Sequence, residues 1–78
     1  MQHTLESHKT QSLYEAAFLL ARGFKLSGKE RTGQKVTIVL EADPTIKDAV
    51  KEYYNGGLVD GKKFSDWYRS LKDFIFER

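Results

Sequence analysis

Cysteine is absent from this 78-residue chain, and no run of apolar residues is long enough to cross a bilayer. Without thiols the chain has no disulfide framework, no thiolate metal site and no cysteine nucleophile. A membrane-spanning helix needs about 18 or more apolar residues, and the amino terminus also lacks the apolar core of a signal peptide. These absences predict a cytoplasmic protein that makes no contact with a membrane.

Groups that support catalysis or metal binding are scarce. The two histidines, His3 and His8, lie near the amino terminus without supporting cysteines or carboxylates, whereas structural zinc normally takes four protein ligands. The acidic residues are expected at helix starts or on solvated helix faces, so no general base is held beside a partner. The six glycines are spread over turns and form no phosphate-binding loop. We therefore expect a protein that is not an enzyme, with no catalytic residue, metal or cofactor.

Composition indicates one small domain. Hydrophobic residues make up 40% of the chain and charged residues 31%, which is typical of globular rather than disordered proteins. Aromatic residues, at 13%, can fill a small core efficiently. Residues 1–11 are polar except for Leu5 and have no sustained period, so we expect a flexible N-terminal tail. A single α+β domain is predicted over residues 12–78.

A first helix is predicted from Ser12 to about Arg22. Ser12 and Glu15 have the spacing of a capping box, and Gly23 supplies a left-handed stop. Apolar residues cover so much of the circumference that this helix must be sandwiched between other elements or must bury one face in a partner.

Two further helices follow in the second half of the chain. Asp43 and Pro44 predict the start of one helix, with aspartate as the N-cap and proline at the first helical position. Residues 55–57, Asn-Gly-Gly, end it. Asp60 is the expected N-cap of the last helix, whose apolar residues repeat at intervals of three and four.

Residues 24–40 lie between the first two helices and alternate as two strands joined by a glycine-containing turn. We predict a three-residue loop, residues 31–33, because this register pairs Leu26 with Ile38 and places nearly all the large apolar side chains on one face. The loop requires a left-handed conformation at Gly33. A two-residue turn ending at Gly33 would divide the apolar residues between the two faces.

These elements predict an α+β fold with the order α-β-β-α-α, in which helices cover one face of an antiparallel β-hairpin. An isolated hairpin is marginally stable in water, so its apolar face must be covered by the amphipathic helices. The expected core comprises Leu20, Phe24, Leu26, Val36, Ile38, Leu40, Val50, Trp67 and Leu71.

The other face of the hairpin is basic in the predicted register. Lys29 and Lys35 would lie directly opposite each other. A solvent-exposed surface tolerates such a like-charge pair, and a phosphate-binding surface would contain one. One hypothesis is therefore weak, sequence-independent nucleic-acid binding, without base stacking because this face has no aromatic residue. The alternative is an ordinary solvated strand face, which is what charged runs usually are. The candidate nucleic-acid contacts are Lys25, Lys29, Arg31 and Lys35.

Several apolar helix residues exceed what a small core requires. The main functional hypothesis is a non-enzymatic interaction module that forms a homodimer or binds a protein partner through these residues, with nucleic acid as the alternative partner. The other interpretation is that the same side chains complete the core. The candidate partner contacts are Tyr14, Phe18, Tyr54 and Phe76.

The order of core and turn residues resembles a family of short, functionally uncharacterised bacterial domains. The residues that carry the resemblance lie in segments 16–26, 35–41 and 50–56, followed by the last helix with Phe64 and Leu71. The resemblance covers most of residues 12–76 and implies a helix, β-hairpin and two-helix pattern in a bacterial intracellular protein. Because its motifs are core and turn residues, it carries no catalytic residue over to this chain.

Overall fold

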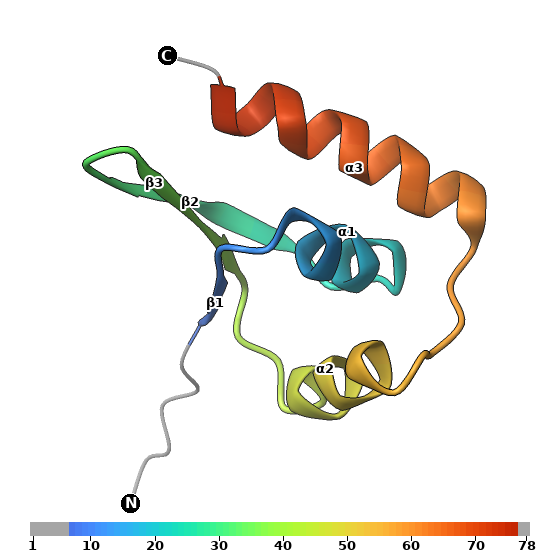
Figure 1. Ribbon diagram of the computed structural model, residues 1–78. Coiled ribbons are helices and arrows are strands. Elements are labelled where there is room, and N and C mark those ends of the chain that lie inside the picture. Colours follow the sequence, from blue (N-terminus) through green and yellow to red (C-terminus); the bar gives the residue numbers. More distant parts are fainter. Residues whose placement is uncertain (1–6, 77–78) are drawn as a thin grey trace, which may run out of the picture.

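The computed structural model describes residues 7–76, and its strands and helices form the predicted α+β fold with one additional strand (Figure 1). Residues 1–6, part of the predicted tail, lie outside this description. The elements in chain order are β1 (His8–Thr10), α1 (Leu13–Ala21), β2 (Leu26–Thr32), β3 (Lys35–Leu40), α2 (Ile46–Tyr54) and α3 (Gly61–Phe76).

Helix α1 is the centre of the fold. Figure 1 shows it between α2 and α3, with the sheet alongside, so of the two predicted alternatives, packing between other elements or burial in a partner, the structure shows the first. Ala16, Ala17 and Leu19 are completely buried, because α1 packs against neighbours around most of its circumference. The two alanines let neighbouring elements approach α1 closely.

Strand β1 corrects the expectation of a flexible tail up to residue 11. It pairs antiparallel with β3, with His8 opposite Leu40, and gives the sheet order β1-β3-β2. Thr10 is buried, and its hydroxyl oxygen accepts a hydrogen bond from the amide of Ser12 at 3.0 Å. The physical reason for the strand is that a lone hairpin leaves one edge of β3 unpaired, and β1 satisfies those backbone groups.

The hairpin closes with a two-residue turn, not with the predicted three-residue loop. Thr32 pairs with Lys35, which leaves Gly33 and Gln34 in the turn. Gly33 has a φ of 62°, as predicted, whereas Gln34 does not have a positive φ. A glycine with positive φ at the first of two turn positions is the pattern of a type II′ turn, which matches the twist of the flanking strands.

A β-bulge in β2 explains why the predicted register is wrong. Leu26 lies opposite Leu40, but one extra residue, Ser27, follows, and beyond it Lys29 lies opposite Ile38. The predicted pairing of Leu26 with Ile38 therefore does not form. The predicted like-charge pair across the hairpin is also wrong, because Lys29 shares the inner face with buried Ile38.

The ends of α1 follow the predicted signals with one difference. The hydroxyl of the N-cap Ser12 accepts a hydrogen bond from the amide of Glu15 at 3.2 Å. The Glu15 carboxylate does not complete the capping box, because it accepts hydrogen bonds from other elements instead. At the other end, Gly23 has a φ of 108°, and the amides of Gly23 and Phe24 donate to carbonyls of the last turn. This Schellman motif makes Phe24 part of the helix end and not of the strand.

Helix α2 begins at Ile46, two residues later than predicted. Asp43 accepts hydrogen bonds from the hydroxyl and the amide of Thr45, at 2.6 and 2.8 Å, in a turn before the helix. These bonds, the hydroxyl bond first, hold the pKa of Asp43 below its usual range. Asp60 caps α3 as predicted, accepting a hydrogen bond from the amide of Lys63 at 2.9 Å.

Most of the predicted core is confirmed. The predicted residues Leu20, Ile38, Leu40 and Leu71 are buried, and Leu26, Val50 and Trp67 are half-buried against them. No helix within residues 7–76 is long and apolar enough to span a membrane.

Candidate functional site

Aromatic side chains from all three helices meet on the two sides of α1. Tyr14 and Phe18 are four residues apart on α1 and are therefore neighbours on its surface. Tyr14 contacts aromatic rings of α3, and Phe18 contacts an aromatic ring of α2. We call the resulting set the aromatic face: Tyr14, Phe18, Tyr53, Tyr54, Phe64 and Tyr68.

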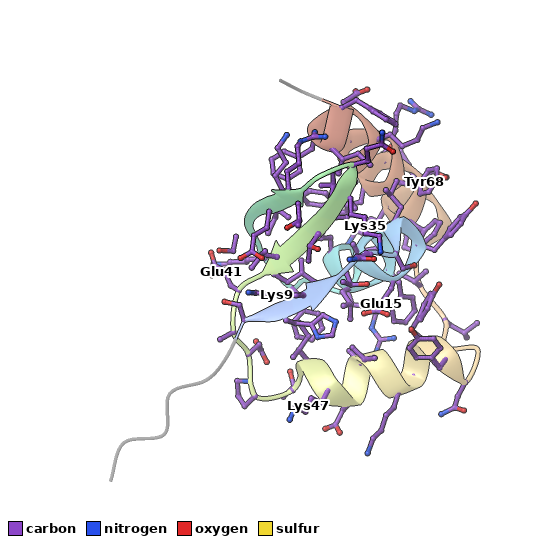
Figure 2. All side chains as sticks on the ribbon, turned by 60° about the vertical axis from the view of Figure 1, so that its left-hand side comes forward. Lys9, Glu15, Lys35, Glu41, Lys47 and Tyr68 are labelled. Carbon is purple, nitrogen blue, oxygen red and sulfur yellow. The ribbon has the colours of Figure 1, made fainter. Side chains whose placement is uncertain are left out.

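The rings of Tyr14, Phe64 and Tyr68 are nearly parallel. The centroids of Tyr14 and Tyr68 are 5.0 Å apart with an interplanar angle of 20°, and Phe64 lies 6.5 and 6.2 Å from them. Figure 2 labels Tyr68 on α3. A hydrogen bond with Tyr14, together with burial, raises the pKa of the Tyr68 hydroxyl above its usual value. Tyr14 is nevertheless 56% exposed, so a fixed aromatic ring faces solvent at the junction of α1 and α3.

The second part of the aromatic face joins α1 to α2. The ring of Phe18 lies 5.3 Å from that of Tyr53, which lies 5.0 Å from Tyr54 in an edge-to-face arrangement. The guanidinium of Arg22 lies 5.4 Å from the centroid of Phe18 and covers it. Arg22 also donates hydrogen bonds to the carbonyl of Leu58 and to the carboxylate of Glu52. The ring of Phe18 is thus buried where α1 contacts α2.

The structure brings together only some of the candidate partner contacts. Tyr14 and Tyr54 belong to the aromatic face and are exposed, whereas Phe18 is only 3% exposed and lies beneath its neighbours. Phe76 is exposed, but it is eight residues beyond Tyr68 on α3, about 12 Å along the helix. Leu58, which is not among the candidate partner contacts, is 89% exposed beside Arg22.

A buried carboxylate connects the aromatic face to β1. The two oxygens of Glu15 accept hydrogen bonds from Nε2 of His8 at 2.7 Å and from the hydroxyl of Tyr54 at 2.8 Å. Glu15 is 5% exposed and lies on the side of α1 that faces α2 (Figure 2). The hydrogen bond to Glu15 raises the pKa of the Tyr54 hydroxyl. From the sequence His8 has no expected partner and Glu15 has only a capping role, so this contact was not predicted.

Two of the four candidate nucleic-acid contacts bind α3 instead of facing solvent together. The ammonium of Lys29 donates to the carbonyl of Phe74 and lies 4.6 Å from the centroid of its ring. The guanidinium of Arg31 donates to the carbonyl of Ile75 at 2.9 Å. The last carbonyls of a helix have no intrahelical donors and carry partial negative charge, so basic side chains stabilise this end. These residues therefore anchor the hairpin to the end of α3.

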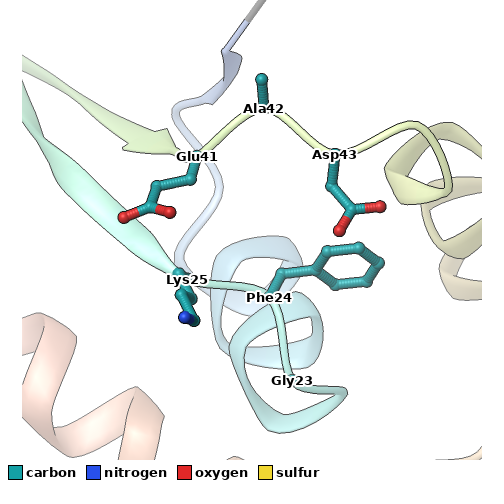
Figure 3. Close-up of a pocket in the computed structure, with 6 residues that line it drawn as sticks. All are labelled: Gly23, Phe24, Lys25, Glu41, Ala42 and Asp43. Carbon is teal, nitrogen blue, oxygen red and sulfur yellow. The ribbon is translucent and has the colours of Figure 1, made fainter. Parts of the chain in front are cut away.

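The remaining two basic candidates lie at opposite ends of the hairpin. Lys35 is exposed and pairs with Thr32 next to the turn. Lys25 lines a shallow hollow of about 220 Å³ with Phe24, Glu41 and Asp43 (Figure 3). The single basic face predicted from the sequence is therefore divided among three places. The lining of this hollow combines positive and negative side chains around the half-buried ring of Phe24.

The described residues offer no constellation that holds a metal ion. Within residues 7–76, no three histidine, aspartate or glutamate side chains come together as a ligand set. His8 is engaged with Glu15, and His3, the other histidine, lies outside the described residues.

A family model described as a domain of unknown function, DUF5659, matches residues 6–77. A search of curated proteins and a search of solved structures found no match. The family match covers β1 as well as the helices and the hairpin, so the strand that the sequence analysis assigned to a tail falls within the matched region.

Proposed function

The chain belongs to the DUF5659 family, whose function is unknown, and we propose that it is a non-enzymatic interaction module. In this proposal, the exposed part of the aromatic face binds a second copy of the chain or another protein. The resemblance to uncharacterised bacterial domains supports a bacterial, cytoplasmic setting for the module.

The single observation that carries the proposal is the state of Tyr14. Its ring is 56% exposed, yet it is stacked on Tyr68 at 5.0 Å and lies parallel to Phe64. Ordering a mobile side chain weakens binding by an estimated 0.5–1.5 kcal/mol, so a ring that is already held loses less entropy on association. Tyrosine is enriched at interfaces because it combines a large apolar surface with a polar hydroxyl.

Two further exposed apolar side chains belong to α2 and the segment that follows it. Tyr54 is 70% exposed and Leu58 is 89% exposed, and both belong to the C-terminal end of α2 or the segment after it. Arg22 donates a hydrogen bond to the carbonyl of Leu58 and also covers the ring of Phe18, the buried member of the aromatic face. Large apolar side chains that stay exposed in a small protein are candidates for an interaction site.

A non-enzymatic role is supported by the hydrogen bonds that the polar side chains beside the aromatic face make with one another. Glu15 accepts hydrogen bonds from His8 and from Tyr54 of the aromatic face, so the polar atoms of these three side chains bond to one another. These bonds support a role in holding β1 and α2 to α1, in contrast to a base held ready for a substrate.

Sedimentation velocity over a range of concentrations tests self-association. We expect the wild type to show a dimer whose fraction rises with concentration, and a Tyr14→Ser, Leu58→Ser variant to remain monomeric. Phe76→Ser is the matched control, because Phe76 is 75% exposed but lies at the other end of α3. A wild type that is monomeric throughout, or a dimer that only Phe76→Ser dissociates, would contradict self-association through this face.

A further inference from the structure

We infer that the surface around Phe24, between the end of α1 and α2, binds an arginine side chain of a partner protein. This surface is separate from the one in the proposed function, because neither Tyr14 nor Leu58 lines it. Phe24 follows the end of α1, and its half-buried ring packs against the core, which holds it in place. A fixed aromatic ring at the surface attracts a cation to its face.

Phe24 lines two hollows, one on each side of the segment where α1 ends. The first, of about 220 Å³, lies at the base of the hairpin, and Figure 3 shows the carboxylate of Asp43 pointing toward the Phe24 ring. The second, of about 280 Å³, lies between Phe24 and one side of α2. Asp48 and Glu52 are four residues apart on that side of the helix and both line the second hollow. A side chain that enters either hollow therefore meets Phe24 and at least one carboxylate.

The charges of the two hollows favour a cationic ligand. The lining contains four acidic and two basic side chains. Arg22 and Glu52 are bound to each other. Within residues 7–76 the other four make no ion pair, and three of them are acidic: Lys25, Glu41, Asp43 and Asp48. An added cation would thus find carboxylates that have no cation of their own.

The surroundings of Arg22 show the chemistry that we expect at Phe24. The guanidinium of Arg22 lies 5.4 Å from the centroid of Phe18 and donates a hydrogen bond to the carboxylate of Glu52 at 2.5 Å. Two further rings of the described part of the chain are covered by cations, but that of Phe24 is not. Phe24 thus has the ring and the neighbouring carboxylates, and a partner would supply the cation.

A peptide-bound arginine fits this surface better than other cations. Its planar guanidinium stacks on an aromatic ring and donates several hydrogen bonds, whereas a lysine ammonium is a compact, strongly hydrated point charge. Free arginine carries a carboxylate of its own, which the acidic lining would repel. A metal ion needs a compact ligand set, and no three acidic or histidine side chains within residues 7–76 form one. In the complex, the guanidinium would lie on Phe24 and donate to Asp48.

The ammonium of Lys25 makes the sign of the ligand testable. Lys25 is the basic side chain of the lining that no described residue pairs with, and it is exposed. Removing its charge should favour a cationic ligand and disfavour an anionic one. Lys25→Gln should therefore tighten the binding of an arginine peptide about twofold, the size expected of an exposed charge interaction.

An NMR titration with a short, end-capped peptide that carries one arginine among glycines and serines tests the inference. We expect the signals of Phe24 and Asp48 to shift as the peptide is added. The matched peptide carries citrulline, which keeps the shape of arginine but is uncharged, and it should not bind. Phe24→Leu removes the ring and Asp48→Asn removes a charge, and each should weaken binding about two- to fivefold. Asp66→Asn is the control variant, because it makes the same charge change at an exposed position of α3 and should leave binding unchanged.

Four results would overturn the inference. The first is no shift of Phe24 and Asp48 with the arginine peptide at about 10 mM, a concentration that detects even very weak binding. The second is equal binding of the citrulline peptide or of a lysine peptide, since neither the charge nor the planar group would then matter. The third is equal weakening by Asp66→Asn and Asp48→Asn, which would indicate non-specific attraction. The fourth is weaker binding by Lys25→Gln.

The NMR spectrum of each variant without peptide establishes that it is folded. The Tyr14→Ser, Leu58→Ser variant changes no side chain of the two hollows, so it should bind the arginine peptide as the wild type does. Failure of this inference and failure of the proposed function are therefore distinguishable.

Discussion

Replacing Glu15 by glutamine tests the polar contact that joins β1, α1 and α2. The Glu15 carboxylate is buried and accepts hydrogen bonds from His8 at 2.7 Å and Tyr54 at 2.8 Å. Glutamine has the same shape as glutamate and keeps one acceptor oxygen for one of these two donors. Its amide nitrogen, itself a donor, would face the other donor and could accept no hydrogen bond from it. A hydrogen bond to a charged group contributes about 1.5–3 kcal/mol, so Glu15→Gln should lower the free energy of unfolding by about 2 kcal/mol. For a domain of this size, Tm should fall by about 8–16 °C.

Thermal and urea unfolding, followed by circular dichroism, measure this loss. Asp66→Asn is the control, because it makes the same chemical change at an exposed position and should alter stability by less than about 0.5 kcal/mol. In a Tyr54→Phe background, the effect of Glu15→Gln should be smaller by about 1 kcal/mol, because one donor has already been removed. An unchanged Tm for Glu15→Gln would refute the structural role of the carboxylate.

The same variant should change the ionisation of Tyr54. The hydrogen bond to Glu15 and the charge of Glu15 raise the pKa of this phenol above the ordinary value of 10.0. The folded state therefore keeps the phenol proton to a higher pH than the unfolded state does. The resulting stability is present below pH 10.0 and is lost as pH rises through the folded-state pKa. Phenolate absorbance should show Tyr54 ionising at a lower pH in Glu15→Gln.

Three other substitutions test the hairpin and the helix ends. Lys29→Ala removes the ammonium bound to the carbonyl of Phe74 and should lower stability by about 1 kcal/mol and speed amide exchange in the last turn of α3, whereas Lys35→Ala should do neither. Gly33→Val places a β-branched residue at a φ of 62° and should lower stability by about 1 kcal/mol or more in urea unfolding. Gly57→Ala would put a Cβ 2.7 Å from a carbonyl oxygen of α2, so calorimetry should show a loss of about 1–3 kcal/mol.

Local signals were sufficient to predict the helices. Ser12 and Asp60 cap α1 and α3 through their own side chains, and Gly23 takes the left-handed conformation that ends α1. Such signals act within a few residues, so they can be recognised in the sequence. The start of α2 is displaced because Asp43 bonds to Thr45 in a turn of its own before the helix begins.

The register of the hairpin depends on partners far along the chain. Pairing all the apolar residues on one face predicted a three-residue loop, but Lys29 and Arg31 occupy the inner side of β2. Their aliphatic stems can cover apolar surface, while their charged groups bind the carbonyls of Phe74 and Ile75. These contacts span more than 40 residues, so no periodicity within the hairpin indicates them.

Strand β1 and the aromatic face depend on tertiary contacts in the same way. Three residues, His8–Thr10, are too few for a recognisable alternating pattern, and the strand forms because the edge of β3 is available. Tyr14 and Tyr54 were identified as surplus apolar residues of helices, which the structure confirms as exposed. Phe18 could not be distinguished from them, because its burial depends on Tyr53 of α2.

Aromatic-ring NMR during a concentration series tests most directly whether the aromatic face mediates association. The chain has four tyrosines and five phenylalanines, few enough to follow individually. We expect the ring signals of Tyr14 and Tyr54 to shift as the concentration rises, while that of Phe76 stays constant. Signals of Tyr14 and Tyr54 that do not move while Phe76 shifts would place the contact elsewhere and contradict the proposed function.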